Sequence, residues 1–425
     1  MDQQNYIFIT NDQTSDKEIV AAHSIVNKFE KKIEERSFTI VNLNKVVCRH
    51  RKWCELLPNV KPFYAVKCNN DPFLLRTLAT LGVGFDCASL SELKLALNVV
   101  PSAEHVLFAH TCKFRQHIEF ADNNNIRRMT FDSAQELGKI KQYHTKPELL
   151  LRIGVQDRAA LFPLDTKFGC DPVEKSDELL ILARAMDIKV IGISFHVGSA
   201  CRNPKVYRKA IRQAKRLFEF GKEIGHQMHV LDLGGGFPGV ESDDHLFEQM
   251  AKTIRAALAD YFPIGASSEI EVIAEPGRFF ATSACSICVE IVGKKSVSAA
   301  LVTKRKKERN EIGYMYFVND GVHGSLCTKY CTKGAEGLPI LIQQKDTASQ
   351  QQYHSIVYGP TCDSRDIVEG PKLMPELECG DRLLYREMGA YTFALSTNFN
   401  GFYAPQFSVY LCSADLVKEI AKQKL

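Results

Sequence analysis

Residues 62–89 read PFYAVKCNNDPFLLRTLATLGVGFDCAS: an apolar run, a longer stretch of mixed character and a second apolar run. Both runs have the composition of strands that are covered on both faces of a sheet. The stretch between them, DPFLLRTLATLG, has its apolar residues at helical spacing. The segment therefore predicts a strand–helix–strand unit of a parallel sheet.

The same alternation continues to about residue 280. Its β-rich runs are PFYAVK, GFDCAS, HVLFAHT, RRMTFDS, ELLLRIGV, KVIGISFHV, HVLDLGGGF and EVIAEPGRF. The first five recur every 21 or 22 residues, and the later ones about every 40. Eight strands with eight crossovers predict an α/β protein with a (β/α)₈ TIM barrel, because an open doubly wound sheet seldom needs eight parallel strands.

After residue 280 the pattern changes to strands separated by turns, with few helical periods. SICVEIVGKKSV, YMYFVNDG, YHSIVYGP, DRLLYREMGAY and QFSVYLC predict a C-terminal, mostly antiparallel β domain. SFTIVNLNKVV near the N-terminus reads as a further strand of that domain. We therefore expect an N-terminal segment (1–45) that contributes a strand, a barrel (46–282) and a β domain (283–425).

The composition excludes several classes of protein. With 425 residues, 45% hydrophobic and 24% charged, the chain suits two domains, or one barrel with an addition. Its 54 basic and 50 acidic residues leave a formal charge of +4, too weak a bias to predict nucleic acid or an anionic membrane as a partner. No stretch offers the roughly 18 apolar residues of a membrane span.

The first residues and the cysteines indicate the compartment. MDQQNYIFITNDQTSDKE lacks the basic and apolar segments of a signal peptide. The 14 cysteines are scattered: only Cys285 and Cys288 have CxxC spacing, and no second such pair or Cys/His motif accompanies them, which argues against a zinc site and a disulfide scaffold. We therefore expect reduced thiols, a cytoplasmic protein and no bound metal.

Several predicted strands end in polar residues, where the active site of a (β/α)₈ barrel collects. A single case, such as Lys67 after PFYAV, usually marks only the point at which the chain reaches the surface. Here six strand ends carry polar or glycine residues, which chance explains poorly. They are Lys67; Asp86, Ser89 and nearby Glu92; Arg152; His196 and Ser199; Gly234, Gly235 and Gly236; and Glu275, Pro276, Gly277 and Arg278.

An amine, an anion cradle and a carboxylate on one rim suggest pyridoxal phosphate. The triple glycine lets backbone N–H groups approach a phosphate, although alone it fits a flexible turn equally well. Arg278 and the Ser199 hydroxyl would add charge-assisted hydrogen bonds. Lys67 would form a Schiff base with the cofactor aldehyde, and Glu275 would keep the ring nitrogen protonated. His196 is more often a satisfied core residue, but on this rim it suits stacking against the ring.

Eight motifs resemble the eukaryotic ornithine decarboxylases, in order and across nearly the whole chain. They are PFYAVKCN, GFDCAS, SFHVGSAC, LDLGGGFPG, AEPGRFF, NDGVHGS, YGPTCDSRD and MGAYT. The resemblance implies an alanine-racemase-like barrel with a β-sandwich-like domain. It also implies a head-to-tail homodimer with shared active sites, in which the C-terminal domain of one subunit completes the site of the other.

The resemblance also assigns roles to single residues around the cofactor. Lys67 matches the Schiff-base lysine, His196 the ring-stacking histidine and Glu275 the partner of the ring nitrogen. The phosphate binders correspond to Ser199, Gly236, Arg278 and Tyr391. The full set expected to bind the cofactor is Lys67, Asp86, Arg152, His196, Ser199, Gly235, Gly236, Glu275, Pro276, Gly277, Arg278 and Tyr391.

Further assignments concern the substrate and the subunit interface. Cys362 matches the thiol that protonates the carbanion carbon after carbon dioxide leaves. Asp363 matches the acid that reaches from the partner subunit toward the side-chain amine of the substrate. Lys167 and Asp366 match an inter-subunit salt bridge.

One segment departs from the family pattern. The family normally reads NDGVYGSFNCILYDH, whereas this chain reads NDGVHGSLCTKYCTKG. His323 replaces a tyrosine, and alignment on Tyr330 puts Cys331 where a second acid holds the distal ammonium of ornithine. We expect His323, Tyr330, Cys331 and Asp363 to line the substrate pocket.

The missing acid predicts a changed substrate. A buried ammonium that loses one of two carboxylate partners forfeits roughly 3–5 kcal/mol. We therefore expect a decarboxylase of L-amino acids that prefers a neutral aliphatic, leucine-like side chain. The alternative is that Asp363 suffices, or that the loop supplies another acid, so that the protein is an ornithine decarboxylase that makes putrescine in polyamine biosynthesis.

Antizyme inhibitors, catalytically inactive relatives that bind antizyme, represent a second class of function. Such proteins tend to lose cofactor contacts, which this chain keeps, so a pure binding role is the weaker hypothesis. The residues kept are Lys67, Asp86, Glu92, His196, Glu275, Arg278, Cys362 and Tyr391. Antizyme stays a candidate partner, because HTCKFRQHIEFADNNNIRRMTFDSAQELGK diverges but keeps scattered basic residues.

Overall fold

The computed structural model describes residues 4–422 apart from 11–15, 34–35, 156–163, 165, 264–269, 333–338, 343–350, 404 and 406. For residues 4–6, 8, 16, 28–33 and 330–332 it describes the backbone alone. The chain forms two compact units. We name them the barrel unit, residues 46–280, and the sheet unit, residues 1–45 with 281–418; the end of the chain from residue 419 groups with the barrel unit.

A closed barrel of eight parallel strands lies at the centre of the barrel unit, which confirms the predicted fold class. Each β-rich run of the sequence supplies one strand, and neighbours follow the order β10-β3-β4-β5-β6-β7-β8-β9. The strands are β3 (Lys61–Ala65), β4 (Gly84–Cys87), β5 (Val106–Phe108), β6 (Arg128–Phe131), β7 (Glu148–Ile153), β8 (Lys189–Phe195), β9 (Val230–Asp232) and β10 (Glu271–Ala274).

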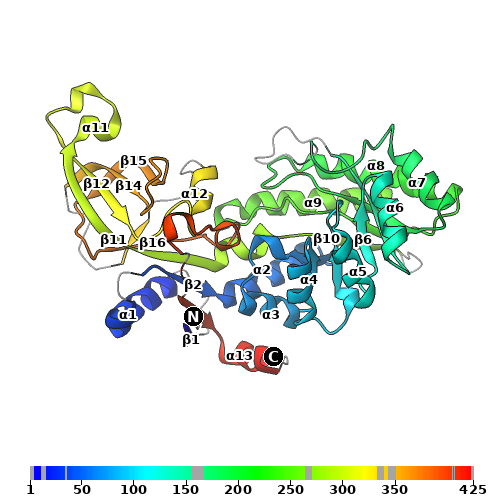
Figure 1. Ribbon diagram of the computed structural model, residues 1–425, viewed down its shortest axis with the longest axis horizontal. Coiled ribbons are helices and arrows are strands. Elements are labelled where there is room, and N and C mark those ends of the chain that lie inside the picture. The colour runs from blue at the N-terminus through cyan, green and yellow to red at the C-terminus, as the bar shows by residue number, and fades with distance from the viewer. Residues whose placement is uncertain are drawn as a thin grey trace. The chain divides into compact units, whose positions relative to one another are not determined.

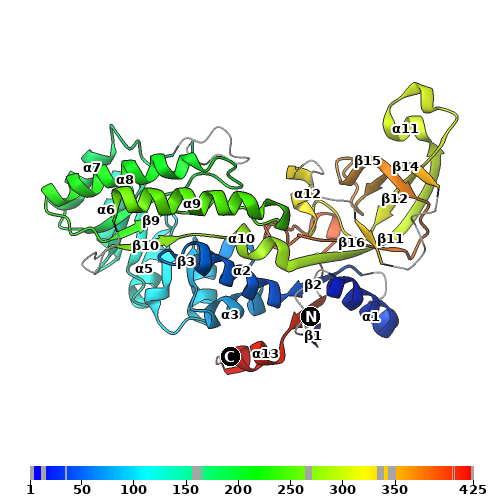
Figure 2. The same cartoon turned by 180° about the vertical axis from the view of Figure 1, so that it is seen from behind.

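Helices cover the outside of this barrel (Figures 1 and 2). In α8 the buried residues Tyr207, Ala210, Ile211 and Ala214 recur at three- and four-residue spacing, so one face of the helix packs inward. The helices are α3 (Pro72–Thr80), α4 (Leu90–Leu97), α5 (Arg115–Asn123), α6 (Ala134–Tyr143), α7 (Ser176–Ala185), α8 (Lys205–Glu223) and α9 (Asp244–Tyr261). Among the described residues, no helix combines the length and the apolar character needed to cross a bilayer.

Two hydrogen bonds at the start of α4 explain why Ser89 and Glu92 lie near the barrel rim. The Ser89 hydroxyl accepts a hydrogen bond from the Glu92 N–H at 3.3 Å, at the start of α4. The Glu92 carboxylate in turn accepts one from the Ala88 N–H at 2.6 Å. Reciprocal bonds of this kind stabilise a helix N-terminus. Glu92 and Ser89 therefore fix the turn that follows β4.

Among the described residues, nine strands form a mostly antiparallel sheet in the sheet unit, as predicted. The main path is β1-β17-β2-β11-β12-β14-β15, and β16 pairs with β11 and β13 beside it. Three pairs, β1·β17, β2·β17 and β12·β14, are parallel. The strands are β1 (Gln4–Ile9), β2 (Phe38–Asn42), β11 (Cys285–Ser298), β12 (Ile312–Val318), β13 (Ile340–Leu341), β14 (Gln352–Tyr358), β15 (Ile367–Pro375), β16 (Arg382–Tyr385) and β17 (Phe407–Cys412).

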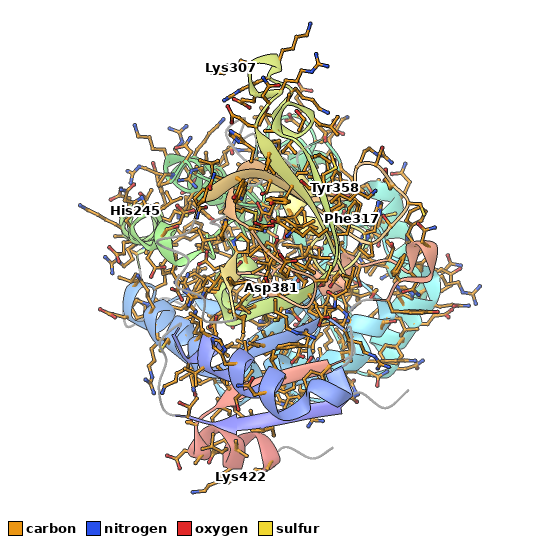
Figure 3. All side chains as sticks on the ribbon, turned by 90° about the vertical axis from the view of Figure 1, so that its left-hand side faces the viewer. His245, Lys307, Phe317, Tyr358, Asp381 and Lys422 are labelled. Carbon is orange, nitrogen blue, oxygen red and sulfur yellow. The ribbon has the colours of Figure 1, made fainter. Side chains whose placement is uncertain are left out.

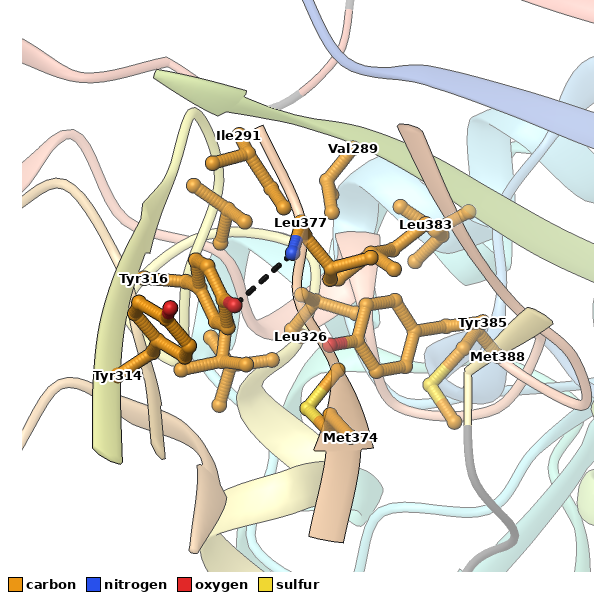
Figure 4. Packing of buried hydrophobic residues seen from close by; sticks show 14 residues of the cluster. Val289, Ile291, Tyr314, Tyr316, Leu326, Met374, Leu377, Leu383, Tyr385 and Met388 are labelled. Atoms are coloured by element: carbon orange, nitrogen blue, oxygen red, sulfur yellow. Dashed lines mark hydrogen bonds between the residues drawn. The ribbon is translucent and has the colours of Figure 1, made fainter. Parts of the chain in front are cut away.

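The sheet unit has its own apolar core, shown in Figure 4. Tyr316 of β12 packs against Tyr314 with ring centroids 5.8 Å apart, and its hydroxyl accepts a hydrogen bond from the Leu377 N–H at 3.0 Å. The next residue, Phe317, stacks on Tyr358 of β14 at 5.7 Å; both are labelled in Figure 3. Since successive residues of a strand point to opposite faces, aromatic contacts cover both faces of β12.

One predicted strand is too long. SFTIVNLNKVV is not a single strand: β2 (Phe38–Asn42) is followed directly by the helix α2 (Leu43–Leu56). Val46 and Trp53 are buried seven residues apart, on one side of that helix. The apolar composition of the segment concealed this period. β2 itself pairs with β11 and β17, so the N-terminal segment does supply a strand to the sheet.

Candidate active site

Lys67 and Asp86 meet at the ends of neighbouring barrel strands. Lys67 lies in a 3₁₀ turn that follows β3 directly, and Ala65 at the end of β3 pairs in register with Asp86 of β4. The lysine Nζ therefore lies 2.5 Å from Oδ2 of Asp86. Asp86 is fully buried, and its Oδ1 has no hydrogen-bond partner within the described part of the chain. Such an oxygen marks a place where a ligand can supply a donor.

The glycine run after β9 forms a cradle beside this rim. Gly234 and Gly236 have φ angles of +61° and +115°, in the region that favours glycine. Gly235 is required by space, because a Cβ at this position would lie 2.7 Å from Nε2 of His196. The run thus lets the backbone and the imidazole approach each other closely.

Tyr207 supports the cradle from α8. Its hydroxyl donates a hydrogen bond to the Gly235 carbonyl at 3.0 Å, and its ring stacks on Phe237 with centroids 5.3 Å apart. The sequence predicted only a helix with a buried face here. Its one available signal was a tyrosine within the apolar stripe of the helix, since a tyrosine hydroxyl needs a partner when it is buried.

Ser199 and Arg278 come together, although 79 residues separate them. Nε of Arg278 donates a hydrogen bond to Oγ of Ser199 at 3.0 Å. They follow β8 and β10, the strands on either side of β9 and its glycine run. A hydroxyl and a guanidinium beside a glycine turn are the groups that commonly hold a phosphate.

Two carboxyl groups are buried at the ends of β9 and β10. Asp232 has no exposed surface, and Glu275 is 5% exposed. Burial raises the pKa of Asp232 to about 6. Burial, together with the negative charges of Asp232 and Asp86, raises the pKa of Glu275 well above its ordinary value. Such a pair retains a proton near neutral pH unless a cation is placed against it.

His196 is neutral in this surrounding. Its Nδ1 accepts a hydrogen bond from the Gly198 N–H at 3.0 Å. Burial, and then the charges of Arg152 and Lys67, lower the pKa of His196 well below its ordinary value. Arg152 in β7 lies with its guanidinium carbon 5.0 Å from the centre of the Phe168 ring. A neutral imidazole suits stacking on an aromatic ring better than pairing with an acid.

The groups on this rim fit pyridoxal phosphate. Lys67 offers the amine, Ser199 and Arg278 offer donors for the phosphate, and Glu275 offers a buried acid for the ring nitrogen. When bound, the cofactor supplies the electron sink for loss of carbon dioxide. The chain's own residues would hold the aldehyde, the phosphate and the ring nitrogen of the cofactor, and burial of Glu275 would keep the ring nitrogen out of water.

Tyr391 and Cys362, also predicted for the site, belong to the sheet unit. Tyr391 has φ of +57°, a conformation that costs a bulky residue on the order of 1–3 kcal/mol and often occurs at ligand sites. Cys362 is exposed, and its N–H donates a hydrogen bond to Oδ1 of Asn400 at 2.8 Å. Their roles toward the cofactor and the carbanion stay predictions.

Asp363 already has two basic partners in the sheet unit. Nε and Nη2 of Arg365 lie 3.1 Å from its two oxygens, and Nε2 of His323 lies 2.9 Å from Oδ2. The His323 ring is tilted against Phe399 with centroids 4.9 Å apart. Hydrogen bonds from Arg365, then from His323, hold the pKa of Asp363 well below its ordinary range. Sequence reasoning named His323 and Asp363 but missed Arg365.

The side chains of Tyr330 and Cys331 lie outside the described residues, so their part in the substrate pocket stays a prediction. Their backbone belongs to the short helix α12 (Cys327–Thr332). The preceding residue, Lys329, is buried, and its Nζ pairs with Oε1 of Glu369 at 2.7 Å. This ion pair attaches α12 to β15.

Asp366 serves a loop of its own unit. It is 1% exposed, and it accepts hydrogen bonds from the Val322 N–H at 2.8 Å and from the N–H and hydroxyl of Thr361 at 3.1 and 2.6 Å. Lys167 is exposed, with its Nζ 5.1 Å from the centre of the Phe168 ring. A salt bridge between Lys167 and Asp366 across a dimer stays a prediction.

Comparison with known proteins decides the family. The sequence model for the pyridoxal-binding domain of pyridoxal-dependent decarboxylases matches residues 43–282. An ornithine decarboxylase of Caenorhabditis elegans is 43% identical over 91% of this chain and 90% of its own length. This chain is a member of the ornithine decarboxylase family. It is therefore a decarboxylase that uses pyridoxal phosphate, as the resemblance predicted.

Two further relatives show the breadth of this decarboxylase family. Antizyme inhibitor 2 of Xenopus laevis is 41% identical over 89% of this chain and 82% of its own length. The crystal structure of the arginine decarboxylase of Paramecium bursaria Chlorella virus, bound to agmatine, superposes with a TM-score of 0.83 at 35% identity. That match covers 92% of this chain and all of the viral enzyme, so the barrel and the sheet are both shared.

Proposed function

We propose that this decarboxylase converts L-ornithine to putrescine and carbon dioxide. The observation that carries the proposal is Asp363, an ionised carboxylate at the position where the family holds the distal ammonium of the substrate. An acid that stays ionised favours a cationic side chain over an apolar one. The similarity to an ornithine decarboxylase over nine-tenths of both chains supports the same substrate.

The neutral, leucine-like substrate expected from Cys331 has less support. It rests on one missing acid, and the decarboxylases compared above are named for ornithine and arginine. The basic partners of Asp363 suggest that the sequence changes weaken the binding of ornithine and do not change the substrate. Because Arg365 and His323 must share the carboxylate with an incoming ammonium, we expect ornithine to bind with a raised KM.

Release of carbon dioxide from ornithine, lysine, arginine and leucine tests the proposal. With pyridoxal phosphate present, we expect kcat/KM for ornithine to exceed that for leucine by at least about tenfold, the effect of one well-placed charge contact. A higher kcat/KM for leucine would refute the ornithine proposal and restore the neutral pocket. The variant Lys67→Ala serves as the inactive control.

The residue roles are part of the proposal. Lys67 binds the cofactor, Glu275 faces its ring nitrogen and His196 stacks on its ring. Cys362 returns a proton to the substrate carbon, and Asp363 receives the side-chain ammonium. We further propose a cytoplasmic homodimer in which the sheet unit of one subunit completes the site of the other.

Binding of antizyme is a second candidate function, favoured by the 41% identity to antizyme inhibitor 2. Two measurements separate it from catalysis: the visible absorbance of the bound cofactor, and co-sedimentation with purified antizyme. If the protein shows the absorbance of the bound cofactor, is active and does not bind antizyme, decarboxylation is the only one of the two functions that it supports. A colourless, inactive protein that binds antizyme would refute the enzymatic proposal.

A further inference from the structure

Asp232 occupies a central place in the barrel that the sequence did not reveal. It is the last residue of β9, it is fully buried, and it pairs in register with Ser194 of β8 and Ile273 of β10. Its carboxylate accepts hydrogen bonds from the Ser194 hydroxyl and from the Gly234 N–H, each at 2.9 Å. These two bonds fix the position of its charge.

The side chain that Asp232 faces is Glu275. The two carboxyl groups lie at the ends of the neighbouring strands β9 and β10, and each influences the charge of the other. Gly234 links them, because the Glu275 N–H donates to its carbonyl at 2.7 Å and its own N–H donates to Asp232. Two neighbouring buried carboxyl groups do not readily both ionise, because the negative charge of one makes the proton on the other harder to remove.

We propose that Asp232 is a positioning residue for the cofactor: it orients the Glu275 carboxyl group and places a negative charge behind it, so that the ring nitrogen of bound pyridoxal phosphate stays protonated. The effect does not depend on which amino acid is the substrate. It acts through Glu275, and Asp232 itself need not touch the ring.

The other charges around the pair are of both signs. Asp86 adds a negative charge that raises the pKa of both carboxyl groups, whereas Lys67 and Arg152 lower that of Glu275. Lys67 is itself paired with Asp86. Burial and Asp232 are the leading influences on Glu275. Asp232 is therefore the charge whose removal should change Glu275 most.

A purely structural role would be to tie β8 to β9 through Ser194. Two probes separate this role from the proposal: pyridoxal phosphate, and the analogue in which a C–H group replaces the ring nitrogen. Affinities of the apoprotein for both are measured by absorbance titration. For Asp232→Asn we expect about tenfold weaker binding of pyridoxal phosphate, the equivalent of one pKa unit, and no change for the analogue.

Asp122→Asn is the matched control. Asp122 also accepts hydrogen bonds from one backbone N–H and one hydroxyl, at 2.9 and 2.7 Å, both from Thr145. We expect Asp122→Asn to bind both probes with the affinity of the wild type. Equal losses for both probes in Asp232→Asn would show a structural role and overturn the proposal, as would equal affinity of variant and wild type for pyridoxal phosphate.

Ser194→Ala keeps the proposal testable if Asp232→Asn does not fold. Loss of the hydroxyl donor makes Asp232 hold a proton more tightly, so the pH at which the bound cofactor changes its absorbance should move upward. Asp232→Asn should move it downward. Unchanged pH dependence in Ser194→Ala, or a shift in the downward direction, would overturn the proposal.

Discussion

The substrate question depends on a single carboxylate and the two side chains that share it. Arg365 is 73% exposed, whereas the Asp363 side chain is 14% exposed. The arginine is therefore hydrated and easily displaced, while the acid is held in place. His323, which replaces the tyrosine of the family pattern, contacts the same carboxylate from a different segment of the chain. Both partners are expected to compete with a substrate ammonium.

Removal of these partners should improve the use of ornithine. We expect Arg365→Ala and His323→Tyr each to lower KM for ornithine by about two- to fivefold, the usual size of a partly exposed ion pair, with kcat little changed. Steady-state kinetics at one pH measure this. Lys175→Ala, in an exposed pair with Glu178, is the matched control and should leave KM unchanged. A raised KM in both variants would mean that they help to bind the substrate.

Asp232 should make the stability of the apoprotein depend on pH. Its pKa rises from 3.8 to about 6 on folding, so the folded state binds more protons between these values. The resulting stability is complete below the lower value and is lost as the pH rises through about 6, a loss of about 2–3 kcal/mol. Asp232→Asn has no carboxyl group at this position, so its free energy of unfolding should not fall in this way as the pH rises.

Urea unfolding of the apoprotein at pH 5 and pH 7.5 measures the effect. Relative to wild type, Asp232→Asn should gain stability between these pH values. Asp122→Asn should show no such change, because hydrogen bonds from Thr145 outweigh burial and lower the pKa of Asp122, whose titration therefore lies below pH 5. A variant-to-wild-type difference that is constant with pH would contradict a raised pKa of Asp232.

At the scale of elements, the sequence predicted the barrel well and the sheet less completely. Each barrel strand is a compact apolar run between helical patterns, so local composition suffices. β15 (Ile367–Pro375) was missed because Gly370 and Pro371 interrupt its apolar alternation. It lies at the end of the sheet path, where a strand tolerates proline. The segment is a strand because it pairs with β14, and a single sequence does not show such pairing.

The buried ion pair that attaches α12 to β15 should be essential for the sheet unit. Glu369 is 1% exposed and contacts both Lys329 and Lys372. Glu369→Ala leaves the Lys329 ammonium buried without its partner, which should cost about 3–5 kcal/mol in the free energy of unfolding. Urea unfolding measures the loss. Glu178→Ala, in an exposed pair, should change it by no more than about 0.5 kcal/mol.

The double variant Lys329→Leu/Glu369→Leu separates burial from pairing. It removes both buried charges, so it should cost much less than Glu369→Ala alone. Equal costs for the two variants would indicate that packing, and not the uncompensated lysine, determines the stability at this position.

A side chain at Gly235, in the turn after β9, should weaken the binding of the cofactor. In Gly235→Ala the new methyl group would meet His196 and the Glu275 carbonyl, 2.7 and 2.9 Å away. We expect about tenfold weaker binding of pyridoxal phosphate, because overpacking of this size typically costs 1–3 kcal/mol. Gly370→Ala is the control, since nothing lies within 4 Å of its added Cβ. Unchanged affinity in Gly235→Ala would show that His196 moves freely.

At the scale of the whole molecule, the residues predicted for one chemistry belong to two different units. The barrel unit holds Lys67, His196 and Glu275, and the sheet unit holds Tyr391 and Cys362. Spacing along the chain predicted the first group, because strand ends of a barrel meet on one rim. The second group came only from family motifs. Tyr207 and Asp232 were missed, since each contacts a residue distant in sequence. Arg365 lies only two residues from its partner Asp363, but the shape of the turn that brings them together is not visible in the sequence.

Tyr391 tests whether the sheet unit completes the phosphate site. Its strained backbone indicates that its position matters more than its local stability. Tyr391→Phe keeps the ring and removes one donor to a charged group, which should weaken pyridoxal phosphate binding by about 10- to 100-fold, corresponding to about 1.5–3 kcal/mol. The thermal shift caused by the cofactor should shrink accordingly.

Tyr403→Phe, at a tyrosine of the same unit that is 63% exposed, is the control and should keep the full shift. The phosphate specifies the contact further: pyridoxal without its phosphate should bind wild type and Tyr391→Phe equally. If both variants bind pyridoxal phosphate as wild type does, the strain at Tyr391 has another cause. The barrel rim alone, with Ser199, Arg278 and the glycine run, would then be sufficient to hold the phosphate.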